Sequence, residues 1–124
     1  ESAVEEMLRY DSPNQIGGRL ALEEGTLRDT TIAANTFVWV ANGAANRDPA
    51  AYDRPDRFDI TRTPNPHLAF GHGPHLCLGA ALARMEAHVA FRRLVRFPHL
   101  QPAAAPVRRP RARHRGFLSY PITV

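Results

Sequence analysis

The first apolar positions of the chain repeat with the period of an α-helix, in which residues three and four apart share one face. The members of this face are Val4, Met7 and Leu8. Ser2 and Glu5 have the residue types and the spacing of a capping box, so we expect Ser2 to cap the helix. Because Pro13 disfavours helical geometry in the residue before it, the helix is predicted to end near Tyr10.

Runs rich in β-branched and aromatic residues come next, and such runs favour strands. They span residues 19–23, 30–32 and 36–40. Together they predict a small antiparallel sheet. Residues 42–46 are expected to form a short helical turn, and the proline-marked stretch 46–59 is expected to be irregular.

A second helical pattern follows Cys77 and is expected to stop at Phe97, before Pro98. One face carries Leu78, Leu82, Met85 and Val89, and a second carries Ala80, Ala83, Ala87, Ala90, Phe91 and Leu94. A helix that is apolar on two sides is normally buried on two sides. Residues 98–110 are interpreted as loop and 116–124 as β-like. The chain is therefore predicted to be α+β, with two main helices, a small antiparallel sheet and long irregular segments.

Composition sets limits on the function of this 124-residue chain. No apolar run is long enough to cross a bilayer, and no signal peptide is present, so no membrane association is expected. The single cysteine excludes an internal disulfide, which is compatible with a reducing cytoplasm, and we expect a cytoplasmic protein.

The charge is distributed unevenly along the chain. All sixteen basic residues are arginine, and no carboxylate side chain follows Glu86. The arginines after this point are 92, 93, 96, 108, 109, 111, 113 and 115. Such a block suits an acidic protein surface or a solvated face. No interleaving of aromatic and basic residues supports nucleic-acid binding, so we expect none.

The candidate chemistry lies in the loop from Phe70 to Gly79, which contains the only cysteine, Cys77. Gly71 and Gly73 can adopt positive φ or let another group approach the backbone closely. Backbone N–H groups at the start of the following helix lie near the sulfur and favour the thiolate.

Four interpretations of this thiol remain open from the residue types alone. Cys77 is a nucleophile with His75 or His72 as its base, or one ligand of a metal cluster in the pattern His72-x-x-His75-x-Cys77. It is otherwise the axial ligand of a haem iron, or a small buried hydrophobe.

The spacing Phe70-x-x-Gly73-x-x-x-Cys77-x-Gly79 resembles the haem-binding signature of the cytochrome P450 family. The longer run from Ala69 to Arg84 is similar to the form found in soluble bacterial members. The resemblance spans nearly the whole chain. It implies that residues 1–124 are the C-terminal, haem-ligand portion of one larger, mainly α-helical domain whose N-terminal part is absent.

The resemblance also implies a cofactor, heme b (iron protoporphyrin IX), with Cys77 as its axial ligand. The implied cofactor-binding residues are Cys77, Arg19, His75, Phe70, Gly71, Leu78 and Gly79. Arg19 and His75 would hold propionates, because guanidinium and carboxylate form bidentate pairs. Backbone N–H groups around Leu78 and Gly79 would tune the sulfur.

Glu6 and Arg9 are three residues apart, and their spacing alone is that of an exposed helical ion pair. They match the Glu-x-x-Arg motif of the family, which implies a buried pair joined by a later basic residue, for which we expect Arg57. The implied substrate-side residues are Asn14, Gln15, Ile16, Arg113 and His114. Relatives usually carry an apolar run around residue 113, so either the pocket accepts polar or acidic groups or this segment does not line it.

By resemblance, the expected activity is that of a haem-thiolate monooxygenase. It would insert one oxygen atom from O2 into a small organic substrate, with electrons from a ferredoxin-type partner. This chain would supply the proximal haem site, and the oxygen-activating helix would lie upstream. The alternatives are a truncated, non-catalytic relative that acts as a binding or structural fragment and a hydrolase that uses Cys77 with His75.

Overall fold

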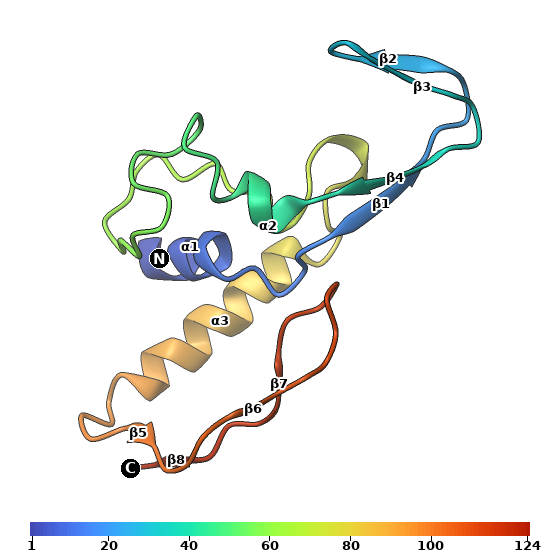
Figure 1. Ribbon diagram of the computed structural model, residues 1–124. Coiled ribbons are helices and arrows are strands. Elements are labelled where there is room, and N and C mark those ends of the chain that lie inside the picture. Colours follow the sequence, from blue (N-terminus) through green and yellow to red (C-terminus); the bar gives the residue numbers. More distant parts are fainter.

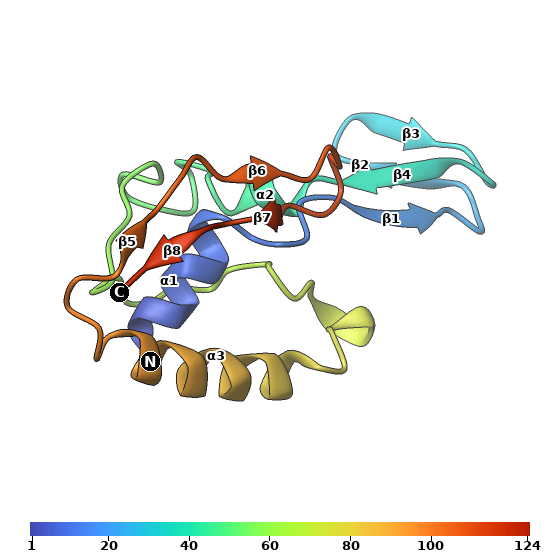
Figure 2. The ribbon, with the colours of Figure 1, turned by 90° about the horizontal axis from the view of Figure 1, so that it is seen from below.

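The computed structural model describes residues 1–124, and its centre is a pair of crossing helices. Helix α1 (Ser2–Tyr10) lies against helix α3 (Ala80–Leu94) in both views (Figures 1 and 2). A long β-hairpin extends away from this pair, and the C-terminal strands form a separate ribbon. The predicted α+β composition, with two main helices and antiparallel pairing, is confirmed.

Helix α1 has the predicted limits but not the predicted cap. Its N-cap is Glu1, and no side chain caps the helix. The Ser2–Glu5 capping box is therefore wrong. The Glu5 carboxylate instead accepts hydrogen bonds from Arg84 on α3, so a tertiary contact takes the place of the local one.

The β-hairpin consists of two antiparallel ladders in series. Strand β1 (Gly17–Leu20) pairs with β4 (Phe37–Val40), and β2 (Gly25–Leu27) pairs with β3 (Thr30–Ile32) at the far end (Figure 1). The first strand begins two residues before the predicted one, and the three-residue β2 was too short to be predicted. Asn35 has φ 61°, a left-handed conformation that asparagine tolerates.

Helix α2 (Asn42–Ala45) confirms the predicted helical turn. From Asn46 to Gly79 the only helix is the 3₁₀ turn η1 (Gly73–His75), as expected for an irregular segment. Nine residues of the chain are buried, and five of these are polar: Glu6, Arg9, Ser12, Asn42 and Asn46. Side-chain hydrogen bonds to backbone groups therefore hold this segment in place where regular secondary structure is absent.

Helix α3 ends at Leu94, three residues before the predicted end. Beyond this point the Phe97 N–H donates to the Leu94 carbonyl (3.1 Å), so the chain tightens into a 3₁₀-like turn as Pro98 approaches. The predicted burial on two sides is wrong within this chain, because α1 covers one side only. The large apolar residues left exposed on α3 are Leu82, Met85, Val89 and Phe91, and Leu78 just before the helix is exposed as well. None of the helices is long and apolar enough to span a membrane.

The C-terminal segment folds back on itself in two short ladders. Strand β5 (Gln101–Pro102) pairs with β8 (Ile122–Thr123), and β6 (Val107–Arg108) pairs with β7 (Phe117–Ser119). The tip between β6 and β7 reaches the segment that follows α1 through an antiparallel bridge between Asn14 and His114. Two segments a hundred residues apart in sequence thus meet at one place.

Candidate functional site

The Cys77 loop contains two positions whose backbone conformation favours glycine. Gly71 and Gly73 have φ of 75° and 70°, in the left-handed region that favours glycine. The Cys77 N–H donates to the Phe70 carbonyl (2.9 Å), which fixes the two ends of the loop together. The Cys77 thiol is exposed, so the interpretation of Cys77 as a buried hydrophobe is wrong.

The start of α3 lies directly beside the sulfur. The Ala80 N–H donates to the Cys77 carbonyl (3.1 Å), whereas the N–H groups of Leu78 and Gly79 make no hydrogen bond within the chain. A Cβ added at Gly79 would stand 4.0 Å from the Cys77 Sγ. The sulfur therefore lies next to two unpaired backbone donors at a helix start.

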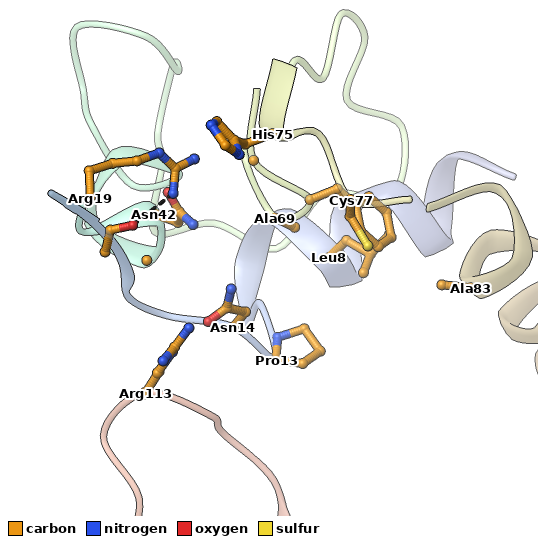
Figure 3. Close-up of a pocket in the computed structure, with 14 residues that line it drawn as sticks. Leu8, Pro13, Asn14, Arg19, Asn42, Ala69, His75, Cys77, Ala83 and Arg113 are labelled. Carbon is orange, nitrogen blue, oxygen red and sulfur yellow. Dashed lines mark hydrogen bonds between the residues drawn. The ribbon is translucent and has the colours of Figure 1, made fainter. Parts of the chain in front are cut away.

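A cavity of about 580 Å³ opens in front of the thiol. Figure 3 shows Cys77 at one side of it, and Arg19 and His75 together at another. Ala69 and Ala83 contribute small side chains to the wall, and Phe70 contributes an aromatic ring. No carboxylate lines the cavity, so its charged groups are cationic.

Two other interpretations of Cys77 find no support in the geometry. No hydrogen bond joins the thiol to His72 or His75, although a nucleophile and its base need such a contact. No group of three or more metal-ligating side chains comes together anywhere in the chain, so the cluster of His72, His75 and Cys77 does not form.

Strand β1 positions Arg19 at the cavity. The preceding Gly18 lies under the Phe37 ring of the paired strand, where an added Cβ would overlap the ring, so glycine allows the two strands to pair. The Arg19 Nη1 donates to the Gly18 carbonyl (2.8 Å) and makes no ion pair within the chain. Its guanidinium therefore keeps most of its donors for another acceptor.

The predicted substrate-side residues divide into two groups. Asn14 and Arg113 line the cavity, whereas Gln15, Ile16 and His114 do not. The Gln15 side chain instead donates to the Ser12 carbonyl (2.6 Å) and lies over Gly43, where an added Cβ would clash with it. The Gln15 side chain therefore packs against α2 and does not reach the cavity, which corrects its predicted substrate-side position.

The ion pair of α1 is fully buried. Arg9 Nε and Nη2 donate to the two oxygens of Glu6, each at 2.8 Å, and both side chains have 0% exposure. Burial by itself would raise the pKa of Glu6, but hydrogen bonds from Arg9 and from the Asp59 N–H hold it below its ordinary value. The hydrogen bond to Glu6 raises the pKa of Arg9. The buried pair that the resemblance implies is therefore confirmed, and the exposed pair that spacing alone indicates is not what forms.

The third member of this cluster is Arg62, whose Nε lies 3.3 Å from Glu6. Arg57 was predicted for this place, and the structure corrects that prediction. The Arg57 side chain is exposed, and only its backbone carbonyl takes part, accepting from Arg9 Nη2 (3.1 Å). The chain turns between the two arginines, so only the later one points toward Glu6.

Asn46 is a buried residue that sequence reasoning missed. Its amide donates to the Ser12 hydroxyl (2.9 Å), its Oδ1 accepts from the Leu68 N–H (2.7 Å), and its carbonyl accepts from Arg9 (2.8 Å). It therefore ties α1 to the segment that leads into the Cys77 loop. No local pattern marks it, because its partners are distant in sequence.

A second ionic cluster was also missed. Arg84 donates to both oxygens of Glu5 (2.8 and 2.9 Å), and His67 Nε2 lies 3.0 Å from the same carboxylate. The Arg84 hydrogen bonds are the main cause of the lowered pKa of Glu5. The Arg84 guanidinium also stands 4.7 Å over the Phe70 ring, so this cluster reaches the loop that carries the thiol.

Comparisons with known proteins agree with this geometry. A family model for cytochrome P450 matches residues 1–121. The biotin biosynthesis cytochrome P450 of Bacillus subtilis is 52% identical over 103 residues, which is 82% of this chain and 26% of that protein. Cytochrome P450 107B1 of Saccharopolyspora erythraea is 54% identical over 106 residues, covering 84% of this chain and 26% of the relative.

A solved structure shows the same arrangement. The crystal structure of P450BioI in complex with acyl carrier protein ligated with hexadec-9Z-enoic acid superposes with a TM-score of 0.94 at 47% identity. The match covers 98% of this chain and 32% of that one. The chain belongs to the cytochrome P450 family. It spans about a quarter of the length of the curated relatives it matches.

The residues around the cavity fit the haem that this family implies. The exposed thiol is free to bind an iron, and the small and aromatic wall suits a flat macrocycle. Arg19 and His75 at one end can donate hydrogen bonds to the carboxylates of such a group, and no carboxylate lines the cavity to compete for them.

Proposed function

We propose that the protein containing this chain is a haem-thiolate monooxygenase that inserts one oxygen atom from O2 into a small organic substrate. The observation that carries the proposal is the placement of one exposed thiol beside a helix start, in a cavity whose only charged lining groups are cationic. Haem b bound to a cysteine thiolate supplies oxygen activation and favours O–O cleavage.

In this proposal Cys77 is the axial ligand. The free N–H groups of Leu78 and Gly79 lie just before α3, next to the sulfur, where they would be available to an iron-bound thiolate. Gly79 keeps this side open, since a side chain there would contact the sulfur. The Phe70 ring packs beside the thiolate, and Gly71 lets the chain turn close to the macrocycle.

Arg19 and His75 hold the two propionates. Both side chains lie at the same end of the cavity (Figure 3), as the two propionates lie on one edge of a porphyrin. Neither has an ion-pair partner within the chain. The buried pair of Glu6 and Arg9, with Arg62, holds the scaffold behind the loop.

We further propose that residues 1–124 are the C-terminal portion of a single larger domain. The exposed apolar face of α3, with Leu82 and Met85 more than half exposed, supports this, because such a face is normally covered. The coverage of about a third of the P450BioI structure supports it too. A non-catalytic fragment and a cysteine hydrolase are the alternatives; the missing thiol–histidine contact disfavours the hydrolase.

The electron donor in this proposal is a ferredoxin-type protein, in the cytoplasm. The last turn of α3 carries Arg92 and Arg93, and Arg96 follows it; all three are exposed and have no ion-pair partner in the chain. Complementary charge on an acidic donor would speed its encounter with this surface.

The decisive experiment replaces the thiol in the full-length protein. Cys77→His and Cys77→Ala are compared with the parent by the absorbance of the reduced carbon monoxide complex. We expect the thiolate absorbance in the parent and its complete loss in both variants. Retention of the parent absorbance in either variant would show that Cys77 is not the ligand. A parent that binds no haem would reject the monooxygenase proposal.

A further inference from the structure

Arg113 is held at the edge of the cavity by backbone pairing. The Gln15 N–H donates to the Arg113 carbonyl (2.9 Å), and the Arg115 N–H donates to the Pro13 carbonyl (2.7 Å). Arg115 also forms an ion pair with Asp11 (2.6 Å), at the end of α1. The position of Arg113 is therefore fixed from both sides, although it lies on a connecting segment.

The Arg113 guanidinium has no partner of its own. It makes no hydrogen bond and no ion pair within the chain, yet it lines the cavity that holds the thiol. No carboxylate is present among the lining residues. Arg113 is exposed at the cavity edge, so its five N–H donors remain available to an anion that enters the cavity.

The haem does not account for this cation. Its two propionates are matched by Arg19 and His75, which lie together at one end of the cavity. Arg113 enters from a different segment, on the side of Asn14 and Pro13 (Figure 3). Arg113 is therefore a cation that the two proposed propionate contacts do not use.

Asn14 provides a second observation on the same side. Its Oδ1 is buried and has no hydrogen-bond partner in the chain. A guanidinium has five N–H donors, so one edge can bind a carboxylate in a bidentate manner while another N–H donates to the Asn14 oxygen. The pair of Asn14 and Arg113 thus has the composition of a carboxylate-binding site with one supporting acceptor.

We propose that the substrate of this protein carries a carboxylate that binds Arg113, beside Asn14. The proposal rests on the monooxygenase function proposed above and adds the substrate class. The carboxylate holds one end of the molecule at the cavity edge, and the apolar remainder extends toward the site of oxidation.

The test measures binding to the full-length, haem-loaded protein. The probes are a straight-chain fatty acid, an aryl alkanoic acid and a steroid carboxylic acid, each with its neutral methyl ester. Substrate-induced changes in the haem absorbance give the dissociation constants. We expect at least one acid to bind about 10- to 100-fold more tightly than its ester, the range of a charge-assisted contact.

Three variants decide which residue is responsible. Arg113→Gln is expected to reduce the acid-to-ester preference to about threefold or less, and Arg113→Lys to keep much of it, since a point charge remains. Arg111→Gln is the matched control, because Arg111 lies on the same segment but does not line the cavity; it is expected to keep the full preference.

The outcomes separate this proposal from the function it rests on. Esters that bind as tightly as acids, no binding by any acid, or a preference that survives in Arg113→Gln would each overturn it. Loss of haem from Arg113→Gln to the extent found in Arg19→Gln would also overturn it, by assigning Arg113 to a propionate. If the parent binds no haem, the monooxygenase proposal fails, and calorimetric binding of the same acids and esters still tests Arg113.

Discussion

Glu5 and Arg84, seventy-nine positions apart, form a bidentate ion pair that joins α1 to α3, with N–O distances of 2.8 and 2.9 Å. The same guanidinium covers the Phe70 ring, whose carbonyl accepts from the Cys77 N–H. The contact between the two main helices is therefore also a contact with the loop that carries the thiol.

Substitutions of this pair should move the haem potential in opposite directions. In Arg84→Gln a positive charge near the thiolate is lost, so the more negative reduced state is disfavoured and the midpoint potential falls. In Glu5→Gln a negative charge is lost and the potential rises. Both variants lose a charge-assisted contact, which destabilises the fold by about 1.5–3 kcal/mol.

Potentiometric titration of the full-length protein checks the direction of each shift. Arg84→Lys is the matched control for charge and should change the potential less than Arg84→Gln. Shifts of the same sign in Arg84→Gln and Glu5→Gln would show that loop displacement, and not charge, governs the potential.

The geometry of the Glu6 cluster predicts that the arginines around it contribute unequally to the stability of the fold. Glu6→Gln leaves Arg9 buried without its counter-charge, which should destabilise the protein by about 3–5 kcal/mol. Arg62→Gln, which removes a contact of 3.3 Å, should cost about 1–3 kcal/mol. Arg57→Gln should cost about 0.5 kcal/mol or less, because its side chain is exposed.

Urea unfolding, followed by circular dichroism, measures these three free energies. The comparison of Arg57→Gln with Arg62→Gln is the informative one, since both remove one arginine from the same segment. An equal loss of stability in the two variants would contradict the geometry of the cluster.

Acid should destabilise the protein through the same two glutamates. The pKa of Glu5 is lowered in the folded state, mainly by the hydrogen bonds from Arg84. The pKa of Glu6 is also lowered, because the hydrogen bond from Arg9 and the other contacts outweigh the opposing effect of burial. The unfolded state therefore binds more protons, so the stabilisation is complete above the ordinary glutamate pKa of about 4.3 and is lost as pH falls below it.

Thermal unfolding between neutral and acid pH measures how steeply the stability falls with pH. Glu5→Gln should show a smaller loss of stability below about pH 4.3 than the parent, because one of the two protonation events is removed. A slope equal to that of the parent would mean that Glu5 does not contribute to the acid sensitivity.

Local sequence was sufficient for the elements whose determinants lie close together. The limits of α1, the turn at α2 and the left-handed glycines of the Cys77 loop follow from spacing, proline and glycine over a few residues. The capping box failed for a tertiary reason, since Glu5 has a stronger partner in Arg84 than in its own backbone. The end of α3 was placed three residues too far, because the tightening of its last turn carries no clear residue signal.

The sequence by itself determined the family, through the fixed spacing around Cys77, and with it the expected ligand and cofactor. Only the tertiary structure decided which arginine reaches Glu6, that Asn46 links α1 to the Cys77 loop, and that Arg113 but not Gln15 faces the cavity. The physical reason is common to all three. Motif spacing specifies backbone turns, whereas the partner of a long or buried polar side chain depends on segments that meet only when the chain is folded.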